Sequence, residues 1–150
     1  MMLKLFEYNW RIREAWFDWC CEVPREELIK DRVGGVGSIL YTLFHIVEVE
    51  YSWLRVIRGE EDLVVKYADH QSLDQIRALS NRFHKEINHG LYSLTDLERF
   101  KKVHVPWDNS VQTVDDILHH MVTHEIHHSG QLSIWSREIG RQPVVARFLE

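Results

Sequence analysis

The hydrophobic positions of the chain fall into four segments with the spacing of α-helices. The first segment spans about residues 3–21 and ends before Pro24. One side of it is an apolar stripe formed by Leu5, Tyr8, Ile12, Ala15 and Trp19. A second apolar face is formed by Phe6, Trp10, Phe17 and Cys20. A helix that is apolar on two sides either lies centrally or packs against another chain. A homodimer interface on this helix is therefore one expectation.

The other three segments are bounded by residues that favour helix ends. Ser38 and Thr113 are candidate N-caps, Ser72 opens a candidate capping box, and Gly59 and Gly140 follow helix C-termini. The residues at helical spacing are Ile39, Leu43, Ile46, Val47, Glu50 and Leu54; Ile76, Leu79, Phe83, Ile87 and Leu91; and Ile117, Met121, His124, His128, Leu132 and Trp135. These stripes predict the buried faces of three further helices.

Residues 93–112 lack a helical pattern and form a long connection before the last helix. Val103, Val105 and Trp107 alternate with other residues, but Pro106 would limit any strand to the edge of a sheet. Loops of this length are usually functional or mobile. Four helices without convincing paired strands predict an all-α four-helix bundle, with residues 1–150 forming a single domain.

The net charge and hydropathy of the chain argue against two classes of partner, nucleic acids and membranes. The net charge is −5, from 18 Lys and Arg and 23 Asp and Glu, whereas a nucleic-acid surface requires clustered basic residues. No stretch approaches the ~20 apolar residues that span a bilayer. The first sixteen residues are too polar for the apolar region of a signal peptide. We expect a cytoplasmic protein without nucleic-acid or membrane partners.

Histidines are concentrated in the last helical segment. Among the ten in the chain, His124 and His128 are four residues apart, so they share a helix face. Both occupy stripe positions where an aliphatic residue would be expected, and burying imidazoles without a partner is unfavourable. A metal ion bound by both rings at ~2.0–2.1 Å would supply that partner.

A metal site requires at least a third ligand, and His45 is the best candidate. It lies beside the apolar stripe of another helix, from which it could face His124 and His128 across the bundle. Three His ligands with an open coordination position are typical of catalytic sites, because structural sites use four protein ligands. His120 is a competing ligand, but three ligands on one straight helix span too far to share an ion.

The chain resembles the DinB family (also called DinB/YfiT-like), four-helix-bundle metalloenzymes found mostly in bacteria. The resemblance rests on the helix order, on residues 38–45 followed by Glu48 and Trp53, and on residues 124–131. It implies an up-down-down-up bundle with a metal bound by His45, His124 and His128. The family usually has Arg after its second ligand on the last helix. Here Ser129 takes that place, which leaves the role of that Arg in doubt.

One carboxylate near the candidate ligands is a candidate for a catalytic role. Glu48 lies one helical turn after His45, so it is a candidate fourth ligand, partner of His45 or general base, and our candidate catalytic residue. A solvated helix glutamate is an equally good interpretation of Glu48. Glu50 and Glu125 are expected to be charges at the surface or at the rim of a dimer.

Two further groups of residues are candidates for supporting roles. Gln131, three residues after His128, is expected to orient that ring by a hydrogen bond. Trp53, Trp107 and Trp135 are candidates to line a pocket, although core packing is the default for Trp at helical spacing.

Three imidazoles suit Zn, Ni or Fe, so they indicate a divalent ion without identifying it. The resemblance implies an enzyme acting on a small molecule, either a hydrolase or a transferase of a low-molecular-weight thiol, with thiol transfer slightly favoured. A thiol bearing carboxylates would favour a basic pocket, and no compact basic cluster is evident near the motif. The alternative is a non-catalytic bundle that a metal ion staples together and that acts as a dimeric interaction module.

Overall fold

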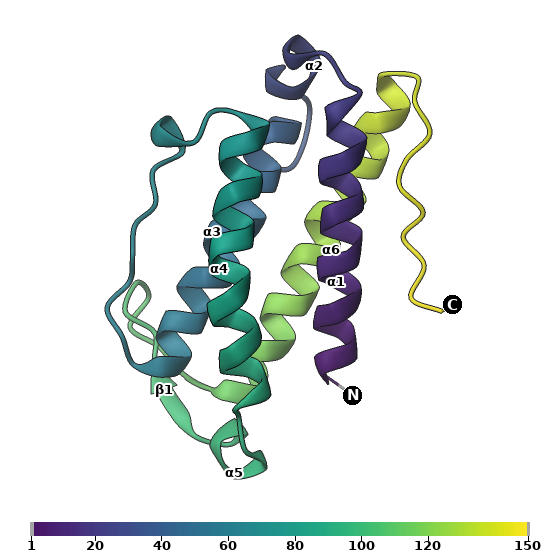
Figure 1. Cartoon of the computed structure of the whole chain (residues 1–150). Coiled ribbons are helices and arrows are strands. Elements are labelled where there is room, and N and C mark those ends of the chain that lie inside the picture. The colour runs from purple at the N-terminus through teal and green to yellow at the C-terminus, as the bar shows by residue number, and fades with distance from the viewer. Residues whose placement is uncertain (1, 150) are drawn as a thin grey trace.

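Four long helices form a bundle in the computed structural model, which describes residues 2–149 (Figure 1). They are α1 (Met2–Cys21), α3 (Ile39–Arg58), α4 (Leu73–Tyr92) and α6 (Val114–Glu138). Helices α1 and α6 run in one direction and α3 and α4 in the other, so the predicted up-down-down-up four-helix bundle is confirmed (Figure 1). Within residues 2–149, no helix is both long and apolar enough to span a membrane.

The predicted helix ends are confirmed. Ser38, Ser72 and Thr113 each accept a hydrogen bond from the backbone N–H three residues later. Gly59 ends α3 with φ of 68°, a left-handed conformation that glycine adopts without strain. The reciprocal bond of a capping box does not form at Ser72, because its hydroxyl donates to the Gln75 side chain instead. Capping side chains therefore set where α3, α4 and α6 begin.

The connections contain short elements that the apolar pattern did not reveal. They are α2 (Arg25–Ile29), the 3₁₀ turn η1 (Tyr67–Asp69), α5 (Asp96–Arg99), β1 (Lys102–His104) and β2 (Val111–Thr113). Strands β1 and β2 pair antiparallel, with Val103 opposite Gln112, so the expectation of no paired strands was wrong. Strands of three residues are too short to show a periodic pattern. The long connection before α6 is thus partly ordered as α5 and a hairpin.

Helix α1 buries more of its second apolar face than of its apolar stripe, of which Ile12 is buried. Phe6, Phe17 and Cys20 of the second apolar face are buried, whereas Tyr8 and Trp19 of the stripe are only partly buried. The segment after α6 runs back along α1 (Figure 1) and covers part of the apolar stripe at Tyr8 and Trp19. The Trp19 indole donates to the Gln142 carbonyl, and the Phe148 ring packs against Tyr8. The chain itself therefore provides part of the contact expected from a second copy.

The core contains a charged cluster that joins α1, α3 and α6. Arg13 donates to both carboxylate oxygens of Glu125 at 2.8 and 2.6 Å, and its Nη2 lies 2.9 Å from Glu50 Oε2. Each glutamate is 5% exposed, so the prediction that Glu50 and Glu125 are surface or rim charges was wrong. Burial raises the pKa of Glu50, and Arg13 acts in the opposite direction. Pairing with Arg13 is what makes burial of these carboxylates tolerable.

Candidate metal centre

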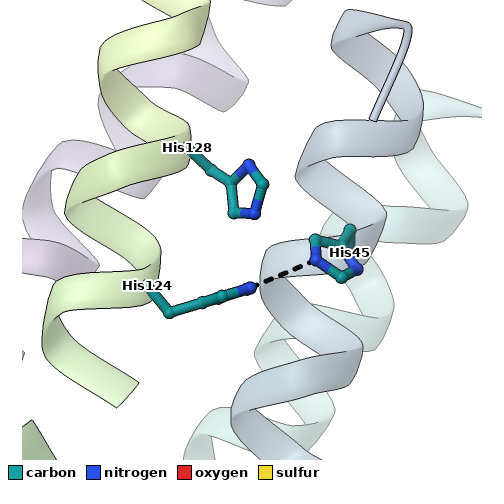
Figure 2. A group of neighbouring side chains, drawn as sticks. All are labelled: His45, His124 and His128. Carbon is teal, nitrogen blue, oxygen red and sulfur yellow. Dashed lines mark hydrogen bonds between the residues drawn. The ribbon is translucent and has the colours of Figure 1, made fainter. Parts of the chain in front are cut away.

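Three histidines from two helices converge at the interface of α3 and α6. His45 projects from α3, while His124 and His128 project from consecutive turns of α6 (Figure 2). One ring nitrogen from each lies within 4.8 Å of the others, and the Nε2 atoms of His45 and His124 are 3.1 Å apart. Two nitrogens bound to one tetrahedral ion at ~2.0–2.1 Å would be about 3.3 Å apart. The group could therefore hold a metal ion.

Hydrogen bonds orient two of the three rings. Nδ1 of His45 is 3.2 Å from the Glu48 carboxylate, and Nδ1 of His128 is 2.7 Å from Oε1 of Gln131. A carboxylate or amide oxygen accepts the Nδ1 proton, which leaves a lone pair on Nε2 of the neutral ring. The expected hydrogen bond between Gln131 and His128 is confirmed. Both rings are held in the tautomer that a metal ion requires.

Burial favours the neutral form of His124 and His128. Together with the neighbouring His128 and His45, burial lowers the pKa of His124 to about 3. Burial also lowers the pKa of His128, although the hydrogen bond to Gln131 acts in the opposite direction. These imidazoles are therefore neutral near pH 7, and the neutral ring is the form that binds metal. The residues present thus fit a divalent cation.

Comparison with known proteins agrees with this geometry. The model of the DinB family matches residues 1–150. The chain belongs to the DinB family. It is 52% identical over 149 residues to the uncharacterized protein YizA of Bacillus subtilis (strain 168), a match that covers 99% of this chain and 94% of that protein. The crystal structure of a DinB-like protein, YjoA of Bacillus subtilis, shares the fold with a TM-score of 0.64 at 15% identity, covering 92% of this chain and 93% of that one.

Two other candidate ligands of this DinB-family chain lie outside the converging group. The group of mutually close ligand atoms comprises the three histidines and contains neither Glu48 nor His120. Glu48 contacts His45 through Nδ1, the nitrogen that does not face His124. Contact with His45 favours a supporting role for Glu48 over that of a fourth ligand. A role as general base stays a prediction.

His120 belongs to a row of aromatic rings beside the three-His group. Its ring centroid lies 5.2 Å from Trp53 and 5.9 Å from His124. Trp53 in turn packs edge-on against Trp107, which extends the row to the hairpin. Trp135, the third Trp expected to line a pocket, is buried in the core instead, and its indole donates to the Val33 carbonyl.

Ser129 faces away from the three histidines. The Trp16 indole donates to the Ser129 hydroxyl at 3.1 Å, which places this side chain on the side of α6 that packs against α1. Arg13 is buried on the same side, where it pairs with Glu125. The departure from the family pattern at Ser129 therefore changes the α1–α6 contact and leaves the three histidines intact.

Sequence reasoning missed the loop that closes over Gln131. Gly35 lies so close that a Cβ added there would be 2.4 Å from Gln131 Oε1 and 3.2 Å from the Trp135 ring. Gly35 also has φ of 54°, whereas a Cβ at the neighbouring Gly34 would meet nothing within 4 Å. The glycine-rich run at residues 34–37 was the available signal. Its contact with Gln131 becomes visible only once α6 is in place.

Proposed function

We propose that this protein is a metal-dependent enzyme that binds one divalent ion, Zn, Ni or Fe, through His45, His124 and His128. The observation that carries the proposal is the convergence of three imidazoles at a partly exposed site on α3 and α6. Three protein ligands are typical of catalytic zinc sites, whereas structural sites use four. The ion would have at least one further coordination position for substrate or solvent.

The bound ion would supply Lewis acidity, and residues of the chain would prepare the site for it. Gln131 and Glu48 hold the Nδ1 protons of His128 and His45, so each Nε2 lone pair stays available. The Glu48 carboxylate is partly exposed, with 27% of its side-chain surface accessible, so it can also exchange protons with a substrate. We assign it the role of general base.

The substrate is a small molecule, and the reaction is transfer of a low-molecular-weight thiol or hydrolysis. The three-His group suits both reactions, because either one requires a polarised electrophile or an activated nucleophile. Their products separate them. Thiol transfer predicts that a small thiol such as 2-mercaptoethanol is consumed together with an electrophile to give a thioether, whereas hydrolysis predicts turnover with water in the absence of any thiol.

Metal content is the decisive measurement. The tag-free protein should contain close to one equivalent of a divalent metal by mass spectrometry. His45→Ala, His124→Ala and His128→Ala should each retain little, while His89→Ala, at an exposed position of α4, should match the parent. A parent that stays empty after Zn and Ni are offered would contradict the proposal.

A metal-stapled, non-catalytic bundle is the second candidate. It is favoured by the fact that the ligands come from two helices, because one ion would then cross-link α3 to α6. This candidate predicts a large loss of stability on metal removal and no access of added ligands to the ion. The enzyme proposal predicts a modest loss of stability on metal removal. It also predicts that small anions such as azide reach the ion, which the visible absorption spectrum of a cobalt-substituted sample reports.

A further inference from the structure

A surface pocket of about 300 Å³ lies beside the metal centre, between α3, the β1–β2 hairpin and the first turns of α6. Its lining includes Trp53, Asp108, Asp116 and His120. His120 stands one helical turn before His124, and their ring centroids are 5.9 Å apart. A molecule that occupies this pocket would therefore lie beside His120, whose ring neighbours His124 of the three-His group.

Two aromatic rings form one wall of the pocket. The Trp53 and His120 rings meet edge-on, with centroids 5.2 Å apart and an interplanar angle of 71°. Trp107 supports Trp53 from the hairpin side, with centroids 4.7 Å apart. Trp107 itself is 48% exposed. Partly exposed Trp rings offer the π-face that attracts cations most strongly among the aromatic side chains.

Two carboxylates give the pocket a negative charge. Asp108 accepts a hydrogen bond from the Ser110 backbone, and Asp116 accepts one from the Thr113 hydroxyl. The bond from Ser110 lowers the pKa of Asp108, so this carboxylate is ionised near pH 7. Neither aspartate forms a salt bridge with any residue in the range 2–149. The described residues that line the pocket include no Lys or Arg.

We propose that this pocket binds the cationic group of the substrate, an ammonium or quaternary ammonium, against Trp53 and between Asp108 and Asp116. A Trp face and carboxylates without basic partners together select for positive charge. The same charges disfavour substrates that carry their carboxylates at this end. The role of the pocket as a substrate subsite rests on the proposed function of the metal centre, whereas its preference for cations requires no metal.

Choline and 3,3-dimethyl-1-butanol provide a direct test, because they share a shape and differ in charge. Each is titrated into the full chain, with and without zinc, and the indole N–H signals are followed by NMR. Choline should shift the Trp53 and Trp107 signals, and the neutral analogue should bind at least about fivefold more weakly, as expected from one charge at close range in water.

Amide variants locate the charge that is responsible. Asp108→Asn and Asp116→Asn should each weaken choline binding by about fivefold. Asp74→Asn is the matched control, because Asp74 is an exposed first-turn aspartate of α4, as Asp116 is of α6. Equal binding of the two ligands, shifts confined to other Trp signals, or full choline affinity in the Asp108→Asn, Asp116→Asn double variant would each overturn the inference.

The result is independent of the metal proposal. Choline selectivity in a protein that takes up neither zinc nor nickel would support the pocket and contradict the proposed enzyme. Zinc uptake without choline selectivity would support the metal centre and overturn the inference about the pocket.

Discussion

Oε1 of Gln131 accepts a hydrogen bond from Nδ1 of His128, with 2.7 Å between the two atoms. The amide nitrogen of the same side chain lies 3.2 Å from His127 Nε2, which is consistent with this orientation of the amide. The amide oxygen and the amide nitrogen of Gln131 thus each have a histidine partner. The bond to His128 leaves the Nε2 lone pair of that ring free. The contact is local to α6, since the residues are three positions apart.

Gln131→Ala should weaken zinc binding by about 10- to 100-fold, the usual cost of removing a residue that orients a metal-binding histidine. Calorimetric titration measures the affinity, and Gln71→Ala, at an exposed position, is the control. Gln131→Glu should largely restore binding, because a carboxylate oxygen also accepts the Nδ1 proton. The ¹⁵N shifts of His128 in the metal-free protein report its tautomer. An unchanged tautomer in Gln131→Ala would contradict the positioning role.

Gly35→Ala should reproduce much of this effect from outside α6. The new Cβ would meet Gln131 Oε1 at 2.4 Å, so the amide must leave its position and release His128. Gly34→Ala is a matched control, because Gly34 also has a positive φ, of 89°, but has open space around its Cβ position. We expect about tenfold weaker zinc binding in Gly35→Ala and none of this loss in Gly34→Ala. Equal affinities in these two variants would refute the explanation.

Glu48 can be tested by separating its hydrogen bond from its charge. Glu48→Ala removes the acceptor for His45 Nδ1 and should weaken zinc binding by about tenfold or more. Glu48→Gln retains an acceptor oxygen, so it should keep most of the affinity. Once a substrate is known, a large loss of kcat in Glu48→Gln at full zinc occupancy would support a general base. Full activity of that variant would leave Glu48 with the positioning role alone.

The four long helices and the three-His group could be predicted from the sequence because both depend largely on local spacing. Periodic apolar positions and capping residues such as Ser38 and Thr113 act within a few residues along the chain. His124 and His128 share a helix face by the same geometry. His45 was found because it lies beside an apolar stripe, where an imidazole needs a partner.

The parts that were missed depend on contacts between distant segments. Arg13 pairs with Glu125 across 112 positions, and a charged residue at helical spacing gives no local sign of such a partner. The glutamates were therefore assigned to the surface by default. Gly35 contacts Gln131 only after α6 is packed, and the paired strands are too short for a periodic signal. The buried ion pair, the Gly35–Gln131 contact and the paired strands all depend on contacts between segments, which the pattern of a single segment does not contain.

The buried cluster of Arg13, Glu50 and Glu125 gives the sharpest prediction about stability. Arg13→Ala would leave two carboxylates in the core without their cation, because both glutamates are 5% exposed. Breaking a buried ion pair in this way costs about 3–5 kcal/mol, so urea unfolding should show a loss of that size. Arg137→Ala, at an exposed position of α6, should change the free energy of unfolding by less than about 0.5 kcal/mol.

Replacing the whole cluster with apolar residues distinguishes two contributions to the free energy of unfolding: the destabilisation by unpaired buried charges and the stabilisation by the ion pairs. In the triple variant Arg13→Met, Glu50→Leu, Glu125→Leu, no buried charge is left unpaired, so most of the stability lost in Arg13→Ala should return. Zinc affinity should stay within about twofold of the parent, because the cluster packs against α1 while the histidines face each other between α3 and α6. A triple variant as unstable as Arg13→Ala would show that the ion pairs themselves hold the three helices together.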